Sequence, residues 1–155
     1  MRALLIGGGT QGLELTRRLS GEGHAVRVVT RNEQAAPLIE DAGGEFCLAD
    51  PDRIGTLRYA LDNVTVLLWL MGRAQTGELH GTRLQMMMER TIDTTVRGVI
   101  YEGNPDGAAI VEKMARYNEI PHAMIDTPRE DEDAWVKSVL AAIDQVLSVD
   151  RNTLG

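Results

Sequence analysis

The chain has 155 residues, of which 43% are hydrophobic and 25% are charged, and its formal net charge is −7. This composition predicts one soluble domain over residues 1–155, and the acidic charge argues against nucleic acid as a partner. The single cysteine, Cys47, excludes an internal disulfide, and the first six residues hold too few apolar side chains for a signal peptide or a membrane span. We therefore expect a cytoplasmic protein without membrane insertion.

Apolar runs alternate with longer amphipathic segments along the whole chain. Strands are predicted at residues 3–6, 25–30, 45–48, 64–71, 96–101 and 122–125. Helices are predicted at residues 10–22, 33–42, 53–61, 78–94, 105–118 and 128–148. Such alternation is typical of βαβ units, so we expect an α/β fold, a single doubly wound parallel sheet of the Rossmann type with strand order 3-2-1-4-5-6 and helices on both faces.

Two of the predicted helices have recognisable starts. Thr127-Pro128-Arg129-Glu130 has the pattern of a capping box with proline at the first helical position, and Asn104-Pro105-Asp106 opens the preceding helix in a similar way. The acidic run at residues 130–133 is interpreted as a solvated first turn, where negative charge suits the helix dipole. A docking site at this run is the alternative.

The first predicted strand is followed by a glycine-rich turn. Gly7, Gly9 and Gly12 match the pattern G-x-G-x-x-G, directly after an apolar strand and at the start of an amphipathic segment. Gly7 would permit the tight turn, Gly9 would let the backbone approach a pyrophosphate, and Gly12 would let the helix pack closely on the strand. With the intervening Thr10 and Gln11, these residues predict a dinucleotide-binding loop at a helix N-terminus. A glycine turn that has lost its ligand is the alternative.

The end of the second predicted strand bears on which dinucleotide would bind. An acidic residue there typically accepts hydrogen bonds from the adenosine ribose of NAD, but this chain has Thr30, Arg31 and Asn32. The Arg31 guanidinium is suited to a 2′-phosphate, so we expect NADP(H) rather than NAD(H). Alternatively, Arg31 is a solvated residue before an exposed helix.

Two further residues complete the predicted cofactor site. Asp50, at the end of the third strand, is placed to accept a hydrogen bond from the adenine amino group; capping of the next helix by Asp50 or Asp52 is an alternative that is compatible with it. Gly72, just after the fourth strand, is assigned to the same site.

These segments together resemble a known family. They are the glycine motif at residues 7–12 and the segments 22–32, 42–45, 49–52 and 57–61. Over about residues 1–72 the chain resembles the atypical short-chain dehydrogenase/reductases, including the NmrA-like NAD(P)-binding proteins. The resemblance implies NAD(P) binding on this half of the chain and, from Arg31, NADP. Many members have G-x-x-G-x-x-G instead, and extended members continue into a substrate-binding region.

The catalytic pair of the ordinary family enzymes is missing. The resemblance implies a tyrosine with a lysine four positions later. In the ordinary family enzymes the tyrosine exchanges a proton during hydride transfer, and the lysine helps to lower its pKa. The only lysines are Lys113 and Lys137, and neither follows a tyrosine at that spacing. Tyr101 and Glu102, at the end of the fifth strand, are the remaining catalytic candidates. The alternative is that Tyr101 is a packed strand residue and Glu102 a loop carboxylate.

No other chemical motif stands out. His24, His80 and His122 lack the spacing of metal ligands, so no metal site is expected. Met86 is the first of three consecutive methionines in a predicted helix, so their side chains point in different directions and not all of them can face the core. A methionine left on the surface is one reason to consider a homo-oligomer contact.

Three functions follow from these patterns. The first is a cofactor-binding protein without ordinary catalysis, such as a redox sensor or regulatory protein, and it is preferred because an intact glycine loop accompanies a missing Tyr/Lys pair. The second is an NADPH-dependent oxidoreductase with a non-standard proton donor. The third is a nucleotide-gated regulatory module of a transport system, although Arg31 argues against it because such modules usually have an acidic residue there.

Overall fold

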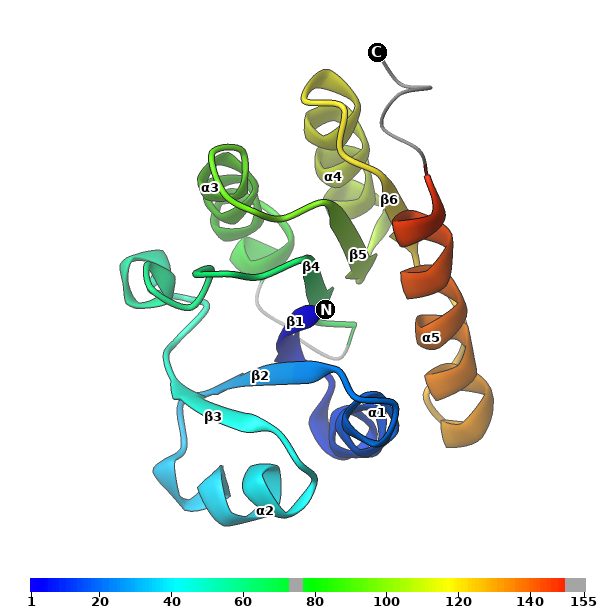
Figure 1. The fold of residues 1–155 in the computed structure, drawn as a ribbon. Helices are drawn as coiled ribbons and strands as arrows, with labels where there is room; N and C mark the ends of the chain where they lie inside the picture. Colours follow the sequence, from blue (N-terminus) through cyan, green and yellow to red (C-terminus); the bar gives the residue numbers. More distant parts are fainter. Residues whose placement is uncertain (73–76, 150–155) are drawn as a thin grey trace.

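The computed structural model describes residues 1–72 and 77–149, and its centre is a parallel sheet. The strands lie in the order β3-β2-β1-β4-β5-β6, each paired in parallel with its neighbours (Figure 1). Their bounds are β1 Arg2–Gly7, β2 Ala25–Thr30, β3 Glu45–Leu48, β4 Val66–Leu70, β5 Gly98–Glu102 and β6 His122–Met124. The predicted fold class and strand order are confirmed.

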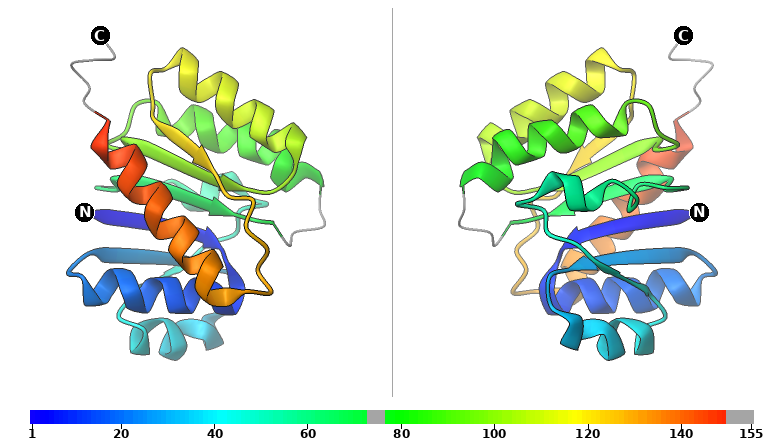
Figure 2. Two further views of the ribbon diagram at one scale, coloured as in Figure 1. Left: turned by 90° about the vertical axis from the view of Figure 1, so that its right-hand side faces the viewer. Right: turned by 90° about the vertical axis from the view of Figure 1, so that its left-hand side faces the viewer.

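Helices cover both faces of this sheet. The α-helices are α1 Gly9–Gly21, α2 Ala36–Asp41, α3 Thr82–Thr91, α4 Pro105–Tyr117 and α5 Glu132–Ser148, and the short 3₁₀ helices are η1 Glu33–Ala35, η2 Ile54–Leu57 and η3 Gly77–His80. One core joins the sheet to α1, α2 and α5, and the other joins it to η2, α3 and α4. Figure 2 shows these two layers from opposite sides of the molecule.

The central strand β4 contributes side chains to the cores on both faces of the sheet. All five of its residues are buried. Leu67 and Trp69 belong to the core under α3 and α4, whereas Val66, Leu68 and Leu70 belong to the core under α1 and α5. A strand buried on both faces therefore appears in the sequence as a continuous apolar run.

Helix α5 begins later than the capping box predicts. Its N-cap is Asp131, whose carboxylate accepts a hydrogen bond from the Ala134 N–H at 3.2 Å, and Thr127 plays no such part. The physical reason is that Arg129 is turned inward to form a buried ion pair. The prediction at Asn104 is confirmed, since its side chain accepts a hydrogen bond from the Gly107 N–H at 2.8 Å.

Three other predicted helices are shorter than their sequence patterns indicate. Residues 33–42 form η1 followed by α2, and residues 78–94 are divided between η3 and α3 at Gly81, whose φ and ψ of −132° and −109° are not helical. Within residues 53–61 only η2 is helical. No helix within residues 1–72 and 77–149 is long and apolar enough to cross a bilayer. Met86 is 37% exposed while Met87 and Met88 are buried, as the methionine run predicts.

Candidate functional site

The turn between β1 and α1 has the backbone that the glycine motif predicts. Gly7, Gly8 and Gly9 all have positive φ, at 88°, 90° and 56°. A Cβ on Gly7 would overlap the carbonyl oxygen of Leu70, the same oxygen that accepts a hydrogen bond from the Gly8 N–H at 2.9 Å. Gly7 is therefore required by both conformation and space, and it fixes the chain against the end of β4.

Helix α1 begins immediately after this turn. A Cβ on Gly12 would lie 3.3 Å from the Gly7 carbonyl oxygen and from Leu5, so Gly12 permits close packing of the helix on β1. The N–H of Gly12 already donates to the Gly8 carbonyl at 2.9 Å. The N–H groups of Gly9, Thr10 and Gln11 precede this first helical bond, so they have no partner inside the helix and can bind an anion.

A pocket of about 400 Å³ lies beside this loop, between α1, β2 and α2. Four predicted residues line it, namely Gly7, Gly9, Thr10 and Thr30. Its other walls, which the sequence reasoning missed, are Leu13, Val28, Val29, Ala35, Leu38 and Ile39. A mostly apolar pocket with a few polar groups is typical of a site for a small organic ligand, and this one lies at the carboxyl edge of the sheet, where doubly wound folds bind ligands.

The end of β2 forms a short hydrogen-bonded turn. Thr30 Oγ1 accepts from the Asn32 N–H at 3.1 Å, and Asn32 Oδ1 accepts from the Gln34 N–H at 3.0 Å and caps η1. Arg31, between them, is exposed. The structure thus gives Thr30 and Asn32 roles in the turn, while Arg31 lies next to the pocket in sequence but is not among its lining residues.

The structure places Asp50 in a turn of its own. Its carboxylate accepts from the Asp52 N–H at 2.9 Å, and its own N–H donates to Thr56 Oγ1 at 2.9 Å. The N-cap residue of η2 is Arg53, and no side chain caps the helix. Asp50 therefore caps the turn before η2 rather than the helix itself, and it does not line the pocket.

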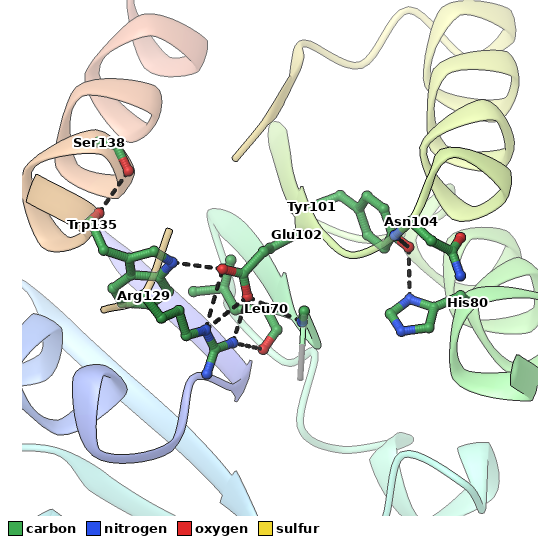
Figure 3. A network of polar contacts seen from close by, with 9 residues as sticks. Leu70, His80, Tyr101, Glu102, Asn104, Arg129, Trp135 and Ser138 are labelled. Carbon is green, nitrogen blue, oxygen red and sulfur yellow. Dashed lines mark hydrogen bonds and ion pairs between the residues drawn. The ribbon is translucent and has the colours of Figure 1, made fainter. Parts of the chain in front are cut away.

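A buried polar network lies at the carboxyl ends of β4 and β5 (Figure 3). Glu102, the last residue of β5, accepts hydrogen bonds from Arg129, from Trp135 Nε1 at 2.6 Å and from the Gly72 N–H at 3.0 Å. Arg129 Nη2 also donates to the Leu70 carbonyl at 2.8 Å. The interpretation of Glu102 as a loop carboxylate is wrong. The sequence gives no sign of Arg129 or Trp135 as partners of Glu102, because both fit the pattern of the predicted helix 128–148 and lie 27 and 33 residues away from Glu102.

This network sets the ionisation of Glu102. Burial favours the neutral acid, but hydrogen bonds from Arg129 and Trp135 outweigh it and hold the pKa of Glu102 below its ordinary value of 4.5. Glu102 is therefore a carboxylate at neutral pH with both oxygens hydrogen-bonded. This state favours a positioning role over that of a proton donor.

Tyr101, the other catalytic candidate, is 1% exposed and packs in the core under α3 and α4. Its hydroxyl lies 2.7 Å from His80 Nδ1 and accepts from the Asn104 N–H at 3.1 Å. Burial raises the pKa of Tyr101 above its ordinary value. A buried phenol with these partners is a packed strand residue, as the alternative interpretation states, and it links β5 to η3 and the start of α4.

No protein family and no curated protein matches the chain in sequence. Solved structures match its fold. Triphenylmethane reductase from Citrobacter sp., complexed with NADP(H), is 20% identical with a TM-score of 0.62, covering 82% of this chain and 49% of that one. Vestitone reductase from alfalfa is 13% identical with a TM-score of 0.65, covering 79% and 55%.

UDP-glucuronic acid 4-epimerase from Bacillus cereus, in complex with UDP-glucuronic acid and NAD, is 12% identical with a TM-score of 0.64, covering 80% of this chain and 55% of that one. The chain spans about half the length of each of these proteins. A short-chain dehydrogenase/reductase superfamily protein from Agrobacterium tumefaciens, with bound NAD, is similar at a TM-score of 0.59. The resemblance to short-chain dehydrogenase/reductases that the sequence predicts is therefore confirmed in the fold.

Proposed function

We propose that this protein binds NADP(H) in preference to NAD(H) and acts as a cytoplasmic redox sensor or regulatory cofactor-binding protein. The observation that carries the proposal is the loop at Gly7–Gly12. A Cβ would collide at Gly7 and crowd at Gly12, whereas at Gly9 it would meet nothing closer than 3.8 Å. The backbone thus leaves open space at the one position where the motif needs a phosphate to approach.

The residues present fit a dinucleotide. Three N–H groups at the start of α1 can bind the pyrophosphate, and the pocket beside them offers apolar walls with Thr10 and Thr30. When bound, the nicotinamide would donate or accept a hydride. Solved neighbours of the same fold were captured with NADP(H) and with NAD, which supports the class of ligand but not the choice between the two.

The preference for NADP(H) rests on Arg31. It is exposed at the end of β2, directly after a pocket-lining residue, and no acidic side chain occupies the end of this strand. Losing a charge-assisted hydrogen bond to a 2′-phosphate should cost about 1.5 to 3 kcal/mol, or roughly ten- to a hundredfold in affinity.

Calorimetric titration with NADPH and NADH tests this preference. The wild type should bind NADPH more tightly, and Arg31→Ala should abolish the difference while leaving the affinity for NADH unchanged. Arg90→Ala, which removes an exposed arginine on α3, is the matched control and should bind as the wild type does. Equal affinities in the wild type, or an Arg31→Ala variant that still discriminates, would contradict the proposed role of Arg31.

The regulatory role rests on the residues at the end of β5. The chain lacks the Tyr/Lys pair, Tyr101 is buried, and Glu102 is ionised within its network. General acid catalysis is typically worth about 10²- to 10⁴-fold in rate, so we expect little turnover with carbonyl, quinone or flavin acceptors when NADPH oxidation is followed. Robust turnover by the wild type would contradict the regulatory interpretation, and turnover that survives both Tyr101→Phe and Glu102→Gln would also exclude these two residues as the proton donor.

A further inference from the structure

Arg129 reaches from the connection between β6 and α5 to the turn that begins α1. The Arg129 side chain is 7% exposed. Its Nη2 donates to the carbonyl oxygen of Leu70, which lies 59 residues away in the sequence. The same carbonyl oxygen accepts from the Gly8 N–H. The guanidinium and the glycine turn therefore share one acceptor and lie side by side.

One nitrogen of Arg129 has no hydrogen-bond partner among the described residues. Nε and Nη2 donate to Glu102, and Nη2 donates also to Leu70. Within residues 1–72 and 77–149, Nη1 donates no hydrogen bond. A Cβ built on Gly9 would lie 3.8 Å from Nη1, so this nitrogen borders the open space above Gly9.

Gln11 gives a second, independent indication at the same place. Its Oε1 lies 3.8 Å from the position of that Cβ and is buried without a hydrogen-bond partner in the described part of the chain. A buried polar atom without a partner is costly, and as placed this oxygen is an acceptor, which needs a donor and not a phosphate oxygen. A turn of the amide about its own axis would replace this oxygen with an NH₂ donor.

We propose that Arg129 is a pyrophosphate-binding residue, whose Nη1 donates to a phosphate oxygen held by the N–H groups of Gly9, Thr10 and Gln11. This inference rests on the proposed dinucleotide binding. Arg129 would supply a charged donor at the phosphates, and it would come from the connection between β6 and α5, far along the chain from the glycine turn. Guanidinium groups are suited to this role because their planar fork can serve two acceptors at once, here Glu102 and a phosphate.

The surroundings hold the guanidinium in place before any ligand arrives. Glu102 pairs with one edge of the guanidinium, and the centroid of the Trp135 ring lies 5.1 Å from Cζ in a cation–π contact. A side chain fixed in this way loses little entropy on binding. Glu102 also neutralises most of the positive charge, so the contact should act as one directed hydrogen bond, worth about tenfold in affinity.

The test compares two ligands and two double variants. Arg129→Met with Glu102→Gln removes both charges together, so that neither is left buried alone. Arg18→Met with Asp133→Asn is the matched control, because it removes an exposed ion pair of 2.9 Å between α1 and α5. NADPH carries the pyrophosphate and the 2′-phosphate, whereas adenosine 2′-monophosphate carries only the latter. Affinities are measured by calorimetry, and folding is checked by circular dichroism.

The Arg129/Glu102 variant should bind NADPH about tenfold more weakly than the wild type and adenosine 2′-monophosphate equally well. The control should bind both ligands as the wild type does. Arg129→Lys, which keeps the charge but loses Nη1, should show the same selective loss, so the proposal remains testable if the double variant fails to fold.

Wild-type affinity for NADPH in the Arg129 variants would overturn the role of Arg129 while leaving dinucleotide binding intact. Equal weakening of both ligands would also overturn it, because a general distortion would then explain the loss. A wild type that binds neither ligand would instead refute the proposed function, and this inference with it.

Discussion

The Glu102–Arg129 pair should dominate the stability of the carboxyl edge of the sheet. Both side chains are less than a tenth exposed, at 7% for Arg129 and 9% for Glu102. Glu102→Gln leaves the Arg129 charge buried without a counterion. It also places an NH₂ group next to N–H donors whose hydrogen bonds the carboxylate now accepts. Removing one partner of a buried ion pair typically costs about 3 to 5 kcal/mol.

The structure also predicts how the two changes combine. When Glu102→Gln is combined with Arg129→Met no buried charge remains, and the amide oxygen introduced at position 102 can still accept from Trp135 Nε1. Each single variant should therefore lose about 3 to 5 kcal/mol of unfolding free energy, and the double variant much less than their sum. Because a domain of this kind is stable by only about 5 to 15 kcal/mol, the single variants should be near the threshold of folding.

Urea denaturation at neutral pH measures this coupling. The fluorescence of the buried residues Trp69 and Trp135 reports the transition, and midpoints are compared for the wild type, both single variants and the double variant. Strictly additive losses would show that Glu102 and Arg129 do not stabilise each other, contrary to this prediction.

Three further outcomes are expected. Because the folded protein lowers the pKa of Glu102, the ionised carboxylate stabilises the fold fully above its ordinary pKa of 4.5. This stabilisation is lost as the pH falls through the lower pKa of the folded state. The urea midpoint should therefore drop less in acid for Glu102→Gln than for the wild type. Gly9→Ala should cost about 1 to 2 kcal/mol because its φ is 56°, while Gly7→Ala should lower the melting temperature further, because its Cβ also overlaps the Leu70 carbonyl. Tyr101→Phe should cost about 1 to 3 kcal/mol in the same urea assay, with NADPH affinity unchanged, because it removes only a buried hydroxyl.

The sheet could be predicted because its signals are local. The run at residues 64–71 is apolar on both faces, and the spacing of Gly7, Gly9 and Gly12 follows from the geometry of one turn. The Asn104 cap likewise depends only on residues three positions apart. Strand order, loop position and helix layers then follow from general rules of parallel sheets.

The rest depends on contacts between distant residues. Arg129 fits the pattern of a first helical turn, yet its pairing with Glu102, 27 residues away, draws it inward and moves the helix start to Asp131. No periodicity indicates such a pair. The pocket walls on α2, including Leu38, were missed for the same reason, since only the packed structure brings them beside the glycine loop.

A crystal of the protein soaked in NADPH would show whether the glycine turn binds a dinucleotide. We expect density for the pyrophosphate against the N–H groups of Gly9, Thr10 and Gln11, with the 2′-phosphate next to Arg31. Saturating NADPH that leaves this loop empty, or a dinucleotide bound elsewhere on the sheet, would contradict the claim that the glycine turn is a cofactor site.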